Sequence, residues 1–146
     1  MISRLILSFT VHPVFTEEEV RHFLVPQKNV VGCYIVEDPK SHKITDFISF
    51  FHIQSSIIGN SKYDSFTASY CNYYATTKTS LKDLMENGLI AAKKEGGDVF
   101  NALEIMKNAT VFEDLKFVKG DGTLHYYFYN WRLNTINPSE MGVVLP

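Results

Sequence analysis

One carboxylate in this chain is held between two glycines, in the segment Gly120-Asp121-Gly122. Glycine adopts backbone conformations that other residues resist, so the flanking glycines predict a tight turn at Asp121. A run dense in aromatic residues follows, from Tyr126 to Trp131. A carboxylate fixed beside such a run is a candidate acceptor for charge-assisted hydrogen bonds. Most Asp-Gly pairs are plain hairpin turns, and on these residues alone that alternative stays open.

The other reactive side chains do not form a recognisable catalytic pattern. Five histidines show no pair at metal-binding spacing, so no metal site is expected. No Gly-x-Ser-x-Gly elbow occurs, and a Cys71 nucleophile would need a base that the sequence does not indicate. Cys33 and Cys71 lack metal-ligand spacing and predict reduced core thiols in a cytoplasmic protein.

Length and composition predict one globular domain. The chain has 146 residues, is 45% hydrophobic and carries a net charge of -2. Without a basic excess to neutralise phosphates, a nucleic-acid partner is not expected. The sequence contains neither a signal-peptide pattern nor an apolar run long enough to span a bilayer, so no transmembrane segment is expected.

Capping residues and hydrophobic periodicity predict the helices of an α+β domain. Thr16 and Glu19 form a capping box, and the helix that follows should end before Pro26. Ser80 should cap a helix with apolar residues at i, i+3, i+4 spacing, which ends at Gly96-Gly97. A short helix is expected over residues 110–115.

Runs of β-branched and aromatic residues predict the strands. Residues 29–37 and 43–52 should form a hairpin, residues 55–64 a loop, and residues 69–77 a third strand with Tyr70, Asn72 and Tyr74 on one face. A short strand over residues 98–103 and a long last strand over residues 124–131 complete the prediction. Tyr73, Tyr74 and the residues from Tyr126 to Tyr129 are expected in the core.

A three-strand meander followed by β-α-β resembles the acyl-CoA N-acyltransferase (GNAT) fold, a mixed sheet flanked by helices. That fold carries a Gln/Arg-x-x-Gly-x-Gly/Ala turn before its central helix, where backbone amides hold the CoA pyrophosphate. Here residues 76–80 precede the helix without a glycine. We therefore expect that this domain does not bind CoA.

The chain from Phe15 to Leu145 resembles the C-terminal half of the glycylpeptide N-myristoyltransferases. The most specific stretch is Lys116 to Gly122, which continues into Tyr126 to Trp131; the family pattern is Lys-Phe-Gly-x-Gly-Asp-Gly, with Val118 here in place of a glycine. Residues 15–20, 45–50 and 98–104 also match, and residues 60–63 and 111–115 resemble protozoan members. The family's N-terminal block Glu-Ile-Asn-Phe-Leu-Cys-x-His-Lys is not found, so residues 1–146 are expected to be the C-terminal half alone.

The resemblance implies one half of a pseudo-twofold, two-half enzyme. The whole enzyme moves myristoyl from myristoyl-CoA to the amine of an N-terminal glycine, and its N-terminal half binds the acyl donor. The implied partners of this chain are glycine-initiated peptides and the N-terminal half. Alone, the chain is expected to be inactive and to self-associate through an exposed apolar face.

The resemblance also assigns site residues. The implied base is the C-terminal carboxylate, here that of Pro146. The tail that leads to it is apolar and can be buried, which leaves the carboxylate as its only charge. A proline at this position departs from the family, because it lacks a backbone N–H. Asp121 would pair with a basic residue of the peptide. Structural roles are the alternatives: Ser55 could satisfy a loop, and Tyr70 could be a core aromatic residue. For Asn101, holding neighbouring backbone together is the better account. The implied peptide groove consists of Ser55, Tyr70, Asn101, Asp121, Gly122 and Leu124.

A second function remains open on the sequence. The chain could be a self-standing peptide-binding or structural domain that keeps the fold without a catalytic role. Acylation on supply of the N-terminal half would favour the transferase, whereas a chain that naturally starts at Met1 would favour the second reading.

Overall fold

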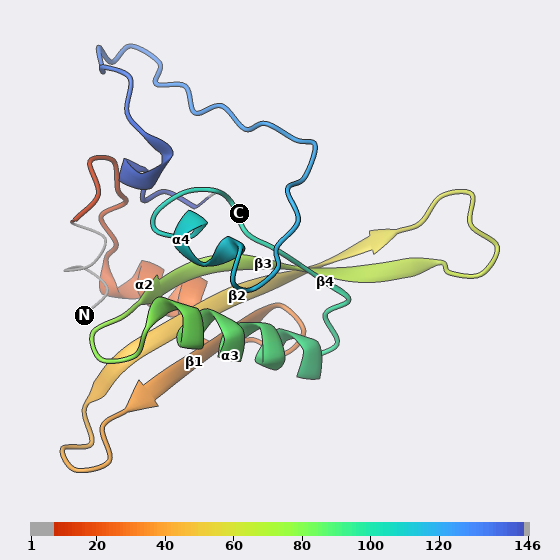
Figure 1. Ribbon diagram of the computed structural model, residues 1–146, viewed down its shortest axis with the longest axis horizontal. Helices are drawn as coiled ribbons and strands as arrows, with labels where there is room; N and C mark the ends of the chain where they lie inside the picture. The colour runs from red at the N-terminus through yellow and green to blue at the C-terminus, as the bar shows by residue number, and fades with distance from the viewer. Residues whose placement is uncertain (1–7, 145–146) are drawn as a thin grey trace.

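The computed structural model describes residues 8–144 and contains a four-stranded mixed sheet (Figure 1). The strands β1 (Val31–Glu37), β2 (Ile44–Ser56), β3 (Ser65–Ala75) and β4 (Val99–Asn101) lie in the order β1-β2-β3-β4. The first three strands are antiparallel, and β4 is parallel to β3 after a crossover through helix α3 (Leu81–Lys94). The predicted meander followed by β-α-β is confirmed.

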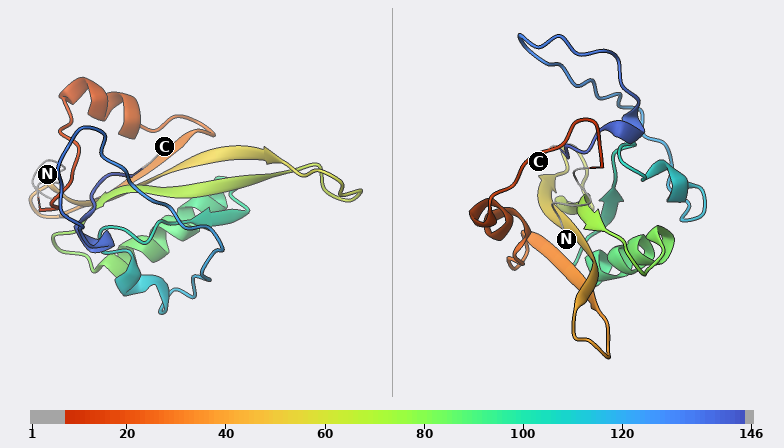
Figure 2. Two further views of the ribbon diagram at one scale, coloured as in Figure 1. Left: turned by 90° about the horizontal axis from the view of Figure 1, so that it is seen from above. Right: turned by 90° about the vertical axis from the view of Figure 1, so that its left-hand side faces the viewer.

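Helices cover both faces of the sheet (Figure 2). Helix α2 (Glu17–Leu24) lies on one face, where Leu24 packs in a cluster with Phe47 and Tyr73. Helix α3 lies on the other face, and its residues Leu84 and Met85 pack against the sheet. Two short elements follow, α4 (Ala109–Phe112) beside α3 and the 3-10 helix η1 (Pro138–Glu140).

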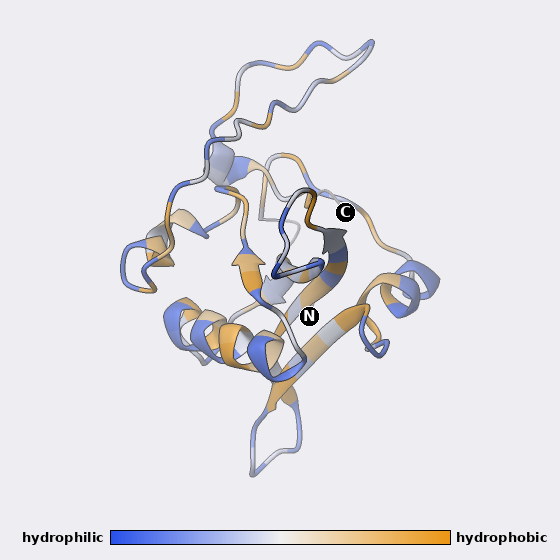
Figure 3. Ribbon diagram, turned by 90° about the vertical axis from the view of Figure 1, so that its right-hand side faces the viewer, coloured by the Kyte–Doolittle hydropathy of each residue, from blue (hydrophilic) through white to orange (hydrophobic). Residues whose placement is uncertain are grey.

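The predicted helix starts are confirmed atom by atom. The Thr16 hydroxyl accepts from the Glu19 N–H at 3.3 Å, and the Glu19 carboxylate accepts from the Thr16 N–H at 2.7 Å. The Ser80 hydroxyl accepts from the Asp83 N–H at 3.1 Å. Along both helices the ribbon in Figure 3 alternates between hydrophobic and hydrophilic residues, as expected for helices with one buried side.

A β-bulge in β3 changes which side chains share a face. The register shifts between Ile48 and Phe50, so that two residues of β3 lie opposite one residue of β2. As a result Tyr74 packs in the core under α3, whereas Tyr73 packs on the α2 side. The prediction that Tyr70, Asn72 and Tyr74 share a face was therefore wrong, because strict alternation fails at a bulge.

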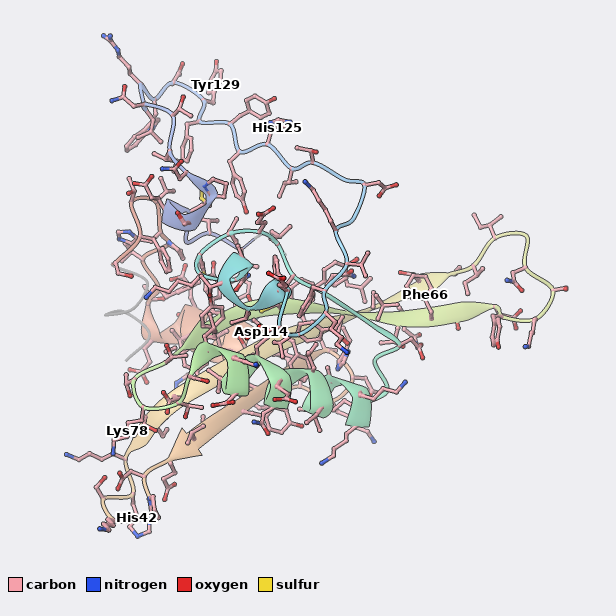
Figure 4. All side chains as sticks on the ribbon, in the orientation of Figure 1. His42, Phe66, Lys78, Asp114, His125 and Tyr129 are labelled. Atoms are coloured by element: carbon pink, nitrogen blue, oxygen red, sulfur yellow. The ribbon has the colours of Figure 1, made fainter. Side chains whose placement is uncertain are left out.

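The hairpin of β2 and β3 extends beyond the sheet as an arm, on which Figure 4 labels Phe66. Ser55 lies opposite Phe66 in this arm. The loop predicted over residues 55–64 is thus shorter, because Ser55 and Ser56 belong to β2. Ser55 and Ser56 stay in the strand because they still pair with Phe66 and Ser65 of β3.

The strand predicted over Leu124 to Trp131 was wrong, and the core predicted over Tyr126 to Tyr129 was right only for Tyr126, which is half-buried and packs against the core cluster. The segment has no strand assignment and runs away from the sheet (Figure 4, where His125 and Tyr129 are labelled). Tyr127 and Tyr129 are 88% and 89% exposed. A run of aromatic residues becomes a strand only beside another strand, and among residues 8–144 the sheet ends at β4. Over the same residues, no helix is both long and apolar enough to cross a membrane.

Candidate functional site

An open groove of about 1250 Å³ is lined by the middle of β3, by β4 and by part of β2, together with the segment that leads from α4 to η1. Four of the predicted site residues line it, and they come from three separate parts of the chain: Tyr70 from β3, Asn101 from β4, and Gly122 and Leu124 from the long segment. The fold therefore brings together residues that are distant in sequence.

Strand pairing fixes the position of the polar part of the groove. Asn101 lies opposite Tyr70 in the parallel pair of β3 and β4, and both side chains are half-buried. The Tyr70 ring stacks on Phe51, with the ring centroids 5.3 Å apart and the planes at 11°. This stacking holds the ring in one orientation and leaves Tyr70 as a rigid wall with a polar end.

An apolar wall completes the groove, and sequence reasoning did not assign it to the site. The Phe117 ring packs against Phe112 at 4.9 Å and edge-on against Phe100 at 6.3 Å. All three rings line the groove. Their spacing in the sequence carries no periodic signal, since they come from β4, α4 and the turn after α4.

Two predicted site residues are not part of this groove, and a third cannot be placed relative to it. Ser55 lies half-buried in the arm, and Asp121 is exposed beside the groove rather than lining it. Pro146 lies outside the described residues.

The backbone around Asp121 corrects the predicted tight turn. The chain only bends at Asp121, and neither Gly120 nor Gly122 has a positive φ. A Cβ added to either glycine would meet nothing within 4 Å. The fold of residues 8–144 thus does not require glycine at these positions. Glycine there leaves the backbone accessible for close approach by another molecule or chain segment.

The loop before α3 contains a filled anion cradle. The Asp46 carboxylate, fully buried on β2, accepts from the backbone N–H groups of Thr77 at 2.5 Å, Lys78 at 2.9 Å and Thr79 at 3.2 Å. It also accepts from the hydroxyls of Thr45 and Thr79. Burial by itself would raise the pKa of Asp46, but these hydrogen bonds outweigh it and hold the pKa well below its ordinary value. The amides at this place therefore bind a carboxylate of the protein itself.

The tail from Met141 to Val144 borders the groove through its two end residues. Its backbone is hydrogen-bonded on both sides, by Val11 and by Met106. Among residues 8–144, no three or more His, Cys, Asp or Glu side chains form a group that could hold a metal ion.

Residues 1–144 match the family profile described as Myristoyl-CoA:protein N-myristoyltransferase, C-terminal domain. The chain belongs to this family. It is 46% identical over 138 residues to glycylpeptide N-tetradecanoyltransferase 1 of Arabidopsis thaliana and 42% identical over 137 residues to the enzyme of Plasmodium falciparum. Both alignments cover 94% of this chain but only 32% and 33% of the relatives, so the chain spans about a third of their length.

Solved structures agree with this assignment. The N-myristoyltransferase of Saccharomyces cerevisiae with bound myristoyl-CoA superposes with a TM-score of 0.76 at 33% identity, over 83% of this chain and 34% of that one. A Trypanosoma brucei acetyltransferase superposes with a TM-score of 0.55 at 10% identity, over 80% of this chain and 83% of that one, which shows a shared fold. The predicted acyltransferase-like fold of this N-myristoyltransferase domain is thus confirmed.

Proposed function

We propose that this chain is the peptide-binding C-terminal part of an enzyme that transfers myristoyl from myristoyl-CoA to the amine of an N-terminal glycine. The observation that carries the proposal is the groove at β3 and β4, lined by Tyr70, Asn101, Gly122 and Leu124, in a chain of this family. An apolar wall with a few polar groups is suited to holding an extended peptide.

The acyl donor is bound outside this chain. The filled cradle before α3 supports this, because the amides of Thr77, Lys78 and Thr79 are engaged by Asp46. A pyrophosphate would have to displace a buried carboxylate to reach them. The relatives are about three times longer than this chain, which leaves a large part of the enzyme to supply the donor site.

Acyl transfer requires a base, because the α-amine has a pKa of about 8 and is mostly an ammonium near neutral pH. A positioned carboxylate takes this proton and frees the amine to attack the thioester. We assign this role to the terminal carboxylate of Pro146. The tail that leads to it is held at the border of the groove, which supports the assignment.

The remaining assignments concern the peptide. Asp121 is exposed beside the groove, where it can pair with a basic side chain downstream of the acceptor glycine. Gly122 allows the peptide backbone to approach closely, and Tyr70 provides an aromatic wall. Ser55, on the arm, would contact the peptide only beyond the groove.

Exposed aromatic side chains and free cysteines indicate what surrounds the chain. Tyr127, Tyr129 and Trp131 are 88%, 89% and 79% exposed, and they would be covered by the N-terminal part or, in the isolated chain, by self-association. Two free cysteines are compatible with a reducing compartment, so we place the protein in the cytoplasm.

The proposal is tested by myristoylation of a glycine-initiated peptide. The chain alone is expected to be inactive, and activity should appear when it replaces the corresponding part of the Arabidopsis relative. A chimera that folds and binds myristoyl-CoA but transfers nothing would favour the second candidate, a peptide-binding domain without catalytic duty. Turnover by the isolated chain would contradict the proposal that the acyl donor is bound outside this chain.

A further inference from the structure

The last described residues of the chain are held by two phenols from different elements. The Tyr73 oxygen, on β3, accepts from the Val144 N–H at 3.1 Å. The Tyr126 O–H donates to the Val143 carbonyl at 2.7 Å. Two adjacent residues of the tail are thus bonded through one N–H and one C=O, which fixes both the position and the rotation of the backbone there.

A second set of contacts holds the tail one step earlier. The Gly142 N–H donates to the Val11 carbonyl at 2.7 Å, and the Met106 N–H donates to the Met141 carbonyl at 3.1 Å. Gly142 is closely covered by Phe9, since a Cβ at Gly142 would lie 2.7 Å from the Phe9 ring. The tail therefore cannot slide by one residue without breaking several bonds at once.

We propose that Tyr73 and Tyr126 are positioning residues that set the location of the chain terminus for catalysis. The inference rests on the proposed function, in which the carboxylate of Pro146 is the base. Pro146 follows Val144 by two residues, which span at most about 7 Å when extended. The position of Val144 therefore limits where the carboxylate can be placed, and an error of about 1 Å in a catalytic group can cost up to a hundredfold in rate.

The environment of the two phenols suits this role. Tyr73 is buried and Tyr126 half-buried, and burial raises the pKa of each phenol above its ordinary value. Both phenols thus stay protonated at the pH of the reaction, and Tyr126 remains a donor. Tyr73 also packs edge-on against Phe15 with ring centroids 5.3 Å apart, which holds its ring in place.

The chain offers a matched control in Tyr74, the neighbour of Tyr73. It is equally buried, and its oxygen also accepts one backbone N–H, that of Lys107 at 3.2 Å. Tyr74→Phe therefore removes the same kind of bond from the same strand, but the lost bond joins Tyr74 to Lys107 and not to the tail. A merely structural role predicts equal effects for Tyr73→Phe and Tyr74→Phe.

The test uses the full-length enzyme with Tyr73→Phe, Tyr126→Phe and Tyr74→Phe. We expect the first two to lower kcat about five- to tenfold, the worth of about one hydrogen bond, with the KM for myristoyl-CoA unchanged. Tyr74→Phe should leave kcat within about twofold at a similar loss of Tm. Amide hydrogen exchange in the C-terminal tail should be faster than in the wild type in Tyr73→Phe. In Tyr74→Phe it should be unchanged. Normal kcat in Tyr73→Phe and Tyr126→Phe, or an equal loss in Tyr74→Phe, would overturn the inference.

A fourth variant separates this inference from the proposed function. Two glycines added after Pro146 convert its carboxylate to an amide, and kcat should fall at least a hundredfold if that carboxylate is the base. If the extended enzyme keeps its kcat, the proposed base is wrong and the positioning role is overturned with it. If the extension abolishes turnover but both tyrosine variants are normal, the base stands and only the positioning role is wrong.

Discussion

The carboxylate of Asp46 accepts the backbone N–H of Thr77 at 2.5 Å, which links the middle strand of the sheet to the loop that starts α3. Asp46 is fully buried, and the next two amides of the loop also donate to it. A buried carboxylate is stable only when hydrogen bonds replace its lost water. The loop and the carboxylate therefore depend on each other.

Asp46→Asn should lower the free energy of unfolding by about 1–3 kcal/mol. The amide oxygen can still accept from the loop, but the full charge is lost and the new NH₂ group faces hydroxyl and N–H donors. Urea denaturation measures the change. Asp114→Asn is the control, because Asp114 is an exposed partner of Lys82 and such pairs contribute little. Equal losses in the two variants would contradict the role of the buried carboxylate.

The same carboxylate predicts a pH dependence. The pKa of Asp46 is lowered in the folded chain, whereas in the unfolded chain it is about 3.9. As the pH falls below about 5 the unfolded state therefore binds more protons, and the stability that Asp46 contributes is lost progressively until the pH has fallen through its folded pKa. The wild type should lose stability more steeply than Asp46→Asn between about pH 5 and pH 3. Parallel stability curves in urea would show that Asp46 does not titrate in this way.

Two glycines that differ only in their surroundings give a third prediction. A Cβ on Gly97 would lie 2.3 Å from the Ser69 hydroxyl oxygen and 3.0 Å from the Ala92 carbonyl, whereas on Gly120 it would meet nothing. Gly97→Ala should lower stability by about 1–3 kcal/mol through overpacking. Gly120→Ala should be neutral or slightly stabilising, because it only restricts the unfolded chain. Thermal unfolding of both variants tests this, and a loss in Gly120→Ala would mean that the segment packs more tightly than described.

Local signals predicted much of this fold because the deciding interactions are local. The Thr16 capping box lies within one turn of its helix, and Ser80 likewise needs only its own first turn. The prediction of the last strand was wrong because the interaction that decides it is not local. Residues 124–131 have the side chains of a strand, but a strand also needs a partner, and no residue within the run reports whether one is present.

The candidate site could be predicted only in part. Tyr70, Asn101, Gly122 and Leu124 were identified through the family motif, and the fold brings them to one groove. The tail contacts of Tyr73 and Tyr126 were not foreseen, because they join residues 71 and 17 positions apart. The filled anion cradle was not predicted for the same reason. The sequence shows that no glycine precedes α3, but it does not show that Asp46 of β2 accepts hydrogen bonds from the amides of that loop.

Asp121→Asn should change the peptide preference of the full-length enzyme. Asp121 is exposed beside the groove, so it is expected to pair with a lysine downstream of the acceptor glycine. For such a peptide kcat/KM should fall about three- to fivefold, the range for an exposed ion pair, and less at high salt. A peptide with alanine in place of the lysine should react as before. Asp64→Asn, at the exposed end of the arm, is the control and should alter neither peptide. Equal losses for both peptides in Asp121→Asn would remove the pairing role and leave Asp121 as a structural residue of the segment.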